Sequence, residues 1–133
     1  MAVDIDIYAE ARTGKKGKPY RFIGYLEGER SYMMFTAMGY KLNNFKPLYK
    51  AKGLPGDVIK GVYLQYKKYD CTFSPSWLST QELMDCINFC ENMLREEEDD
   101  DFEILDSYRN IYEVLKEYED KGEAARIVFW FDQ

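Results

Sequence analysis

The segment that most constrains the fold is 125–131, near the end of the chain. It reads Ala-Arg-Ile-Val-Phe-Trp-Phe, with large apolar residues at successive positions from 127 to 131. Successive side chains of a strand point to opposite faces, so a strand formed here is apolar on both faces. Such a strand is stable only where both faces are covered. The segment therefore predicts an interior strand with a neighbour at each edge.

The beginning of the chain predicts one of those neighbours. From Val3 to Glu10 the odd positions are apolar and the even positions are polar or aromatic, which is the period of a half-buried strand. Residues 13–19 form a basic, glycine-rich turn, and 20–26 read as the return strand of a hairpin. We expect the final strand to pair beside the first.

Helices are predicted between these strands. Ser31 to Met38 forms a short helix that Gly39 ends, and Asp57 caps a helix that runs to about Lys68. Residues 40–56 look irregular, and 74–76 (Ser-Pro-Ser) predict a turn. We expect an α+β fold in a single domain, 1–133, with about four helices packed on one face of a small, mostly antiparallel sheet built from the N-terminal hairpin and the C-terminal strand.

The second half of the chain carries the clearer helix signals. Ser79 followed by Glu82 is a capping box, and the helix behind it has an apolar stripe. That stripe comprises Leu83, Ile87, Cys90 and Leu94. A last helix spans about 106–120, and the acidic run 96–101 before it is expected to be a solvated loop.

Histidine is absent, which excludes serine–histidine and cysteine–histidine catalysis and histidine zinc sites. Three cysteines without a framework spacing, Cys71, Cys86 and Cys90, predict free thiols in a reducing compartment. Cys86 and Cys90 share a helical face, and we interpret them as core residues rather than as a metal or redox pair. The carboxylates of Asp4 and Asp6 are expected on a solvated strand face. No cofactor, metal site or catalytic residue is predicted.

Charge is divided unevenly along the chain. Residues 1–69 hold 13 Lys and Arg against 6 Asp and Glu, whereas 70–133 hold 5 against 18. The lysines of the first half lie among tyrosines, the combination with which proteins bind phosphates and bases; they could equally balance the acidic half within one fold. The leading ligand-binding candidates are Arg30, Tyr32, Tyr40 and Lys52, because they flank the irregular segment 40–56, where a loop-lined pocket forms most easily.

Several short motifs occur in an order that resembles small uncharacterised proteins of bacteriophages and prophages. They are Arg-x-Tyr-x-x-Phe at 30–35, Gly-Leu-Pro-Gly-Asp at 53–57, Ser-Trp-Leu at 76–78 and Arg-Ile-Val-Phe-Trp-Phe-Asp at 126–132. The opening strand ends in Tyr-Ala-Glu, as theirs do. Members of this group often carry a histidine shortly before Ser-Trp-Leu, where this chain has Phe73 and Pro75. The resemblance implies a phage accessory protein and implies no activity.

The sequence favours a non-enzymatic accessory protein that engages a host component, either a host protein or a nucleotide or nucleic-acid ligand, through a basic, tyrosine-rich face. The first alternative is an inhibitor whose acidic second half mimics nucleic acid, and the second is a carboxylate- or metal-dependent hydrolase. The longest apolar run, 127–131, is far shorter than the ~20 residues of a membrane span. We expect a location in the bacterial cytoplasm with no membrane partner, and a homo-oligomer stays an open alternative.

Overall fold

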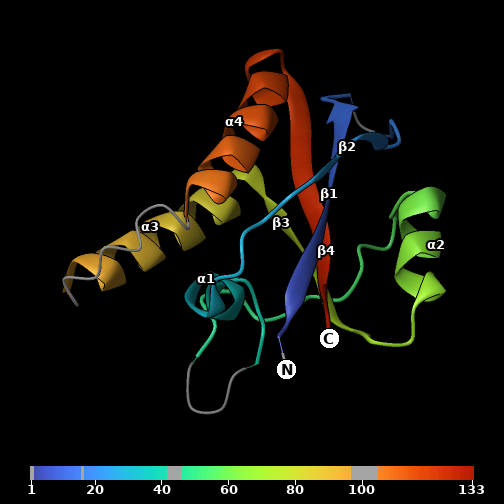
Figure 1. Cartoon of the computed structure of the whole chain (residues 1–133). Coiled ribbons are helices and arrows are strands. Elements are labelled where there is room, and N and C mark those ends of the chain that lie inside the picture. The colour runs from blue at the N-terminus through green and yellow to red at the C-terminus, as the bar shows by residue number, and fades with distance from the viewer. Residues whose placement is uncertain (1, 16, 42–45, 97–104) are drawn as a thin grey trace.

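The structure, a computed structural model, describes residues 2–15, 17–41, 46–96 and 105–133. In these residues the chain is an α+β fold with one antiparallel sheet of strand order β2-β1-β4-β3 and four helices (Figure 1). The elements in chain order are β1 (Asp4–Thr13), β2 (Arg21–Leu26), α1 (Tyr32–Ala37), α2 (Lys60–Lys68), β3 (Thr72–Ser79), α3 (Thr80–Glu96), α4 (Asp106–Asp120) and β4 (Glu123–Asp132). None of the described helices is long and apolar enough to cross a membrane.

Strand β4 occupies the interior position that its sequence predicts. It pairs with β1 on one edge, where Ile7 faces Phe129, and with β3 on the other, where Leu78 faces Ile127. Every residue from Ala125 to Phe131 is buried. The expected pairing of the first and last strands is therefore confirmed, and so is the β1–β2 hairpin.

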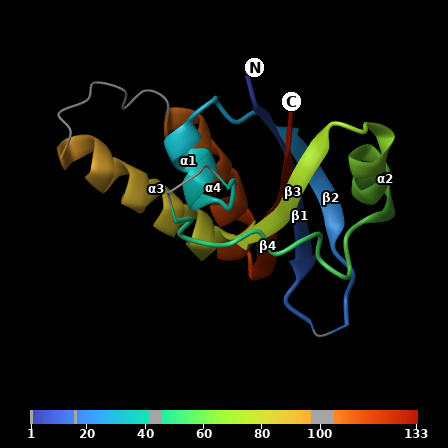
Figure 2. The same ribbon diagram turned by 90° about the horizontal axis from the view of Figure 1, so that it is seen from below.

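The two faces of the sheet are covered differently. The inner face, defined by Ile7, Ile127 and Phe129, contacts α1, α3 and α4 and forms the main core. The outer face, defined by Tyr8 and Trp130, carries α2, which the two views place alone on that side of the strands (Figures 1 and 2). The prediction that the helices pack on a single face is wrong. The difference arises because β4 is apolar on both faces, and α2 shields the second one.

The capping box and the last helix are also confirmed. The Ser79 hydroxyl accepts a hydrogen bond from the Glu82 N–H at 3.2 Å, and Glu82 Oε1 accepts one from the Ser79 N–H at 3.0 Å. Cys86 and Cys90 are buried core residues of α3, as interpreted from the sequence. The side chain of Leu94 and nearly all of the acidic run 96–101 lie outside the described residues.

The predicted turn at 74–76 is wrong, because these residues lie within strand β3. The pairing register of β3 with β4 shifts between Phe73 and Ser76, and Ser74 has φ +50°. This irregularity accommodates Pro75 in an edge strand, where the missing N–H leaves no ladder partner unpaired. Serine and proline predict turns locally, but the apolar β4 beside them supplies the pairing that makes a strand.

The predicted helix cap at Asp57 is also wrong. Helix α2 begins at Lys60 after Ile59, without a side-chain cap. The Asp57 carboxylate instead accepts a hydrogen bond from Arg126 Nη1 at 2.9 Å. The Ile59 N–H donates to Glu10 Oε2 at 3.3 Å, so a carboxylate from β1 takes the place of the local cap.

Candidate functional site

The outer face of the sheet carries a half-covered aromatic cluster. The Tyr8 ring stacks on Trp130 with centroids 5.0 Å apart, meets Tyr25 edge-on at 5.1 Å and lies 6.3 Å from Phe22. Helix α2 covers the Trp130 end through Tyr66, whose ring is 5.2 Å from Trp130. On the β2 side the same cluster is open, since Phe22 is 53% and Tyr25 50% exposed.

Between α2 and β2 the outer face is hollowed into a groove, which we call the α2 groove. Its volume is about 320 Å³. It is lined by Tyr8, Phe22, Ile59, Gly61, Val62 and Gln65. The lining is mostly apolar, and its polar side chains are those of Tyr8 and Gln65. Such a groove can hold an apolar or aromatic group, with few polar atoms to orient it.

The solvent side of α2 is basic and aromatic. Lys60, Lys67 and Lys68 form no ion pair within the described residues. Lys67 Nζ lies 5.8 Å from the centroid of the Tyr63 ring, and Lys68 Nζ lies 5.5 Å from that of Tyr69. These distances correspond to weak cation–π contacts, which leave the ammonium groups in water. This helix therefore presents uncompensated positive charge beside exposed rings.

A buried ion network fixes the start of α2 to the sheet. Arg126 of β4 donates from Nε to Glu10 Oε1 at 2.7 Å and from Nη1 to Asp57, and its guanidinium lies 3.6 Å from the centroid of the Tyr20 ring. The Glu10 side chain is fully buried. Its pKa is raised, because desolvation outweighs the opposing effects of Arg126 and the Ile59 N–H. This network sets the position of α2 against β1 and so the width of the α2 groove.

Three carboxylates lie at the other end of the outer face. Asp4 of β1 is paired with Asp132 of β4, and Asp6 is the next residue of β1 on the same face of the sheet. A hydrogen bond with Asp6, followed by burial, raises the pKa of Asp132 to about 7. Tyr25 donates to Asp6 Oδ1 at 3.0 Å, and burial together with Asp6 raises its pKa to about 12. Within the described part of the chain no group of three or more His, Cys, Asp or Glu is arranged to hold a metal ion.

These carboxylates line an open cleft of about 820 Å³ that extends to the 27–30 segment and α4. The predicted site residue Arg30 lies in this cleft, where it forms a bidentate ion pair with Asp4 (Nε to Oδ1, 2.5 Å; Nη2 to Oδ2, 3.2 Å). The pairing lowers the pKa of Asp4 and raises that of Arg30. An incoming phosphate would have to compete with this carboxylate.

The four predicted site residues do not form one cluster. Tyr32 and Tyr40 are neighbours, with ring centroids 6.4 Å apart, but Tyr40 packs against Phe73 and Phe131 of the sheet. Tyr32 is exposed at the start of α1. Whether any of these residues binds a ligand stays a prediction.

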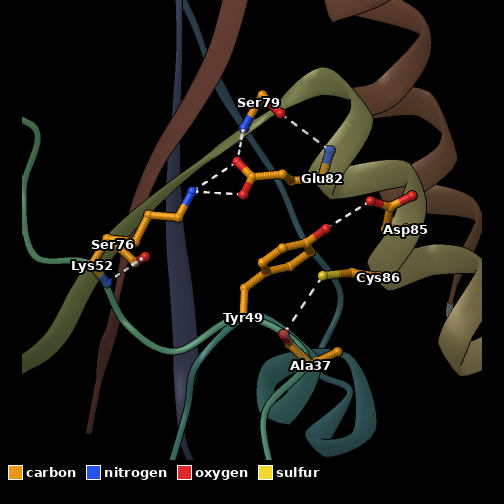
Figure 3. A network of polar contacts seen from close by, with 8 residues as sticks. All are labelled: Ala37, Tyr49, Lys52, Ser76, Ser79, Glu82, Asp85 and Cys86. Carbon is orange, nitrogen blue, oxygen red and sulfur yellow. Dashed lines mark hydrogen bonds and ion pairs between the residues drawn. The ribbon is translucent and has the colours of Figure 1, made fainter.

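Lys52 belongs to a separate polar network that Figure 3 shows from close by. Its Nζ contacts both Glu82 oxygens, at 2.7 and 2.9 Å, and lies 3.9 Å from the centroid of the Trp77 ring. Its backbone N–H donates to the Ser76 hydroxyl at 3.0 Å. Glu82 is also the capping-box residue, and its pKa is lowered because hydrogen bonds from Lys52 and Ser79 outweigh desolvation. These contacts hold the 50–53 segment along β3.

The neighbouring part of this network is held by Tyr49, which donates to Asp85 Oδ2 at 2.7 Å (Figure 3). This bond raises the pKa of Tyr49 to about 12 and lowers that of Asp85. Cys86 Sγ lies 3.6 Å from the Ala37 carbonyl oxygen, and burial raises its pKa. A thiol kept protonated in this way is a poor nucleophile and metal ligand.

Sequence reasoning missed the residues that the α2 groove brings together. Phe22, which lines the groove, and Tyr25 of the adjoining aromatic cluster are three apart in β2, and they reach the same face only because a bulge leaves Ile23 without a partner on β1. One local signal in the sequence could have indicated the groove. Gly61 is the second residue of α2, and no turn at this position requires a glycine. No protein-family model matches the chain, and no significantly similar curated protein or solved structure was found. The resemblance to phage proteins stays a prediction.

Proposed function

We propose that this chain is a non-enzymatic accessory protein, of bacteriophage or prophage type, that binds a host protein through the outer face formed by α2 and β2. The observation that carries the proposal is the placement of exposed apolar side chains. Five of the eight large hydrophobic side chains that are exposed among the described residues lie on β2, on α2 or directly after α2. They are Phe22, Tyr25, Tyr63, Leu64 and Tyr69.

Exposed aromatic residues gathered on one face are typical of binding surfaces rather than of ordinary solvated surface. Tyrosine and phenylalanine are enriched in the centres of protein interfaces, whereas isolated exposed apolar residues need no explanation. On α2, Tyr63 and Leu64 point away from the core, although inward positions such as Val62 suffice to attach the helix. The lysines beside them supply the polar rim of an interface.

The sheet edges are poorly suited to the other common mode of binding, addition of a strand. The bulge at Ile23 interrupts the ladder of edge strand β2. On edge strand β3, the Gly53 N–H donates to the Pro75 carbonyl oxygen at 2.9 Å, so part of that edge is already occupied. The partner therefore contacts the face of the sheet and the helix, not a free backbone ladder.

The test is a comparison of capture by matched variants. Immobilised wild-type protein is incubated with lysate of a bacterial host, and retained proteins are quantified by mass spectrometry against Leu64→Ser and against the control Phe89→Ser. Phe89 is also an exposed apolar residue, 38% exposed, but it lies on α3. We expect a saturable host protein that Leu64→Ser releases and Phe89→Ser retains. Equal retention by all three proteins would refute the proposal, as would a loss caused by Phe89→Ser alone.

A further inference from the structure

Gly61 has no structural requirement in the fold, and it lines the α2 groove. A Cβ added at Gly61 would meet no atom within 4 Å, and its φ lies in the ordinary helical region. By contrast, a Cβ on Gly39, which has φ +118°, would come within 2.9 Å of the Ala51 nitrogen. A helix that contains glycine is less stable than one with alanine at the same position. Since no packing contact requires a glycine at position 61, the presence of Gly61 calls for another explanation. The explanation we draw is that the missing side chain keeps the α2 groove open.

The size and chemistry of the groove restrict what enters it. Its volume of about 320 Å³ is at the low end of the range of ~300–1,000 Å³ typical of ligand sites. Rings on the β side and Val62 on the helix side offer contact area, but Gln65 is the one amide side chain in the lining. A nucleobase has several donors and acceptors that would stay unpaired here, whereas an apolar side chain has none.

The charges near the groove indicate what flanks the entering group. Lys60 precedes Gly61 in the sequence of α2, and Arg12 lies on the outer face of β1, on the same side as Tyr8, with its guanidinium 4.8 Å from the centroid of the Tyr20 ring. Neither Lys60 nor Arg12 forms an ion pair within the described residues, and Lys67 and Lys68 extend this positive charge along α2. The carboxylates of Asp6 and Asp132 lie at the opposite end of the face. Glu10 and Asp57 are carboxylates at the groove end of the face, and both are paired with Arg126. Lys60 and Arg12 therefore leave this end with an excess of positive charge, which is complementary to a negatively charged partner.

We propose that the α2 groove receives a single large apolar or aromatic side chain from the partner protein, and that carboxylates on both sides of it contact Lys60 and Arg12. This inference rests on the proposed function and specifies the chemistry of its partner. It corresponds to the usual energetics of interfaces, in which a buried aromatic anchor supplies most of the affinity and the charged rim supplies orientation and association rate.

The test is a titration of ¹⁵N-labelled protein followed by NMR. The probe is a capped peptide, Asp-Glu-Trp-Glu-Asp, and the comparison probes are its Trp-to-Ala analogue, Lys-Lys-Trp-Lys-Lys and a twelve-nucleotide oligo-thymidine. We expect saturable shifts of the amides of Phe22, Val62 and Gln65 with the acidic tryptophan peptide. Removing its ring should weaken binding by about fivefold or more, the effect of losing a moderate anchor. The lysine peptide should bind more weakly still.

A groove-filling variant supplies the matched control. Gly61→Leu places an apolar side chain in the groove and also raises helix propensity, so the protein should stay folded. Asn88→Leu adds the same side chain at an exposed position of α3. We expect Gly61→Leu to abolish the shifts and Asn88→Leu to leave them unchanged, with thermal unfolding confirming both folds. If Gly61→Leu were unfolded, Phe22→Ser would replace it.

Several outcomes would overturn the inference. They are shifts that survive Gly61→Leu, equal binding of the tryptophan and alanine peptides, and oligo-thymidine binding at the same amides in preference to the acidic peptide. The groove inference and the proposed function can be refuted independently of one another. If Leu64→Ser releases a captured host protein while the groove takes no peptide, the inference alone is wrong, whereas capture that is insensitive to Leu64→Ser refutes the proposed function.

Discussion

Removing Arg126 should destabilise the protein strongly, because it leaves the Glu10 carboxylate buried without its cation. The guanidinium is 5% exposed, and it lies 2.7 Å from Glu10 at Nε and 2.6 Å at Nη2. Breaking one partner of such a buried pair costs about 3–5 kcal/mol, against a total stability of about 5–15 kcal/mol for a small domain. Asp57 contributes little to this loss, since its side chain is 60% exposed and returns to water.

The assay is urea unfolding of Arg126→Met followed by tryptophan fluorescence, with the free energy of unfolding obtained by linear extrapolation. The control is Glu10→Gln/Arg126→Met, which removes both charges and keeps an oxygen for the Ile59 N–H. Neutral replacement of a buried pair is often close to neutral in stability, so we expect the double variant to regain roughly half or more of the loss.

The same variant has a predictable pH dependence. The pKa of Glu10 is already raised by burial, and without Arg126 the pKa rises further. A carboxyl group whose pKa is higher in the folded state than in the unfolded state stabilises the folded state at low pH. This stabilisation is lost as the pH rises through the pKa of the folded state. Arg126→Met should therefore lose less stability at pH 5 than at pH 8. Equal stability of the single and double variants at pH 8 would refute the reasoning.

Three further predictions concern the interior strand β4, the start of helix α3 and the carboxylate pair formed by Asp6 and Asp132. Phe129→Ala, at a fully buried position, should lower the free energy of unfolding by about 3–5 kcal/mol, and a loss below ~1 kcal/mol in urea unfolding would contradict an interior β4. Ser79→Ala should lower it by about 1 kcal/mol, whereas the neighbouring exposed substitution Gln81→Ala should have little effect. Because the pKa of Asp132, about 7, exceeds its ordinary value of 3.8, the wild type should lose stability as pH rises from about 4 through 7. Asp132→Asn should flatten that loss, and thermal melts that fall equally in both proteins would exclude this pair as its source.

Elements whose signals are local could be predicted from the amino-acid sequence alone. The alternation from Val3 to Ala9 and the two-sided apolar run of β4 specify strands, because burial of a strand face has a period of two residues. The capping box at Ser79 and the apolar stripe behind it specify α3, because each depends only on residues three or four positions apart in the sequence. The core position of Cys86 and Cys90 follows from the same stripe.

Contacts between residues that lie far apart in the chain depend on tertiary packing and could not be predicted in this way. Segment 72–79 is a strand because β4 offers it an edge, although its own serines and proline favour a turn. Arg30 and Lys52, which carry the same charge and flank the 40–56 segment, form ion pairs with different carboxylates, Asp4 and Glu82 respectively. Burial of Arg126 likewise recruits Asp57 away from the helix cap, because an ion inside the fold requires partners wherever the chain can supply them. The α2 groove also depends on tertiary packing, since its two sides lie far apart in the sequence and only packing of α2 on the outer face brings them together.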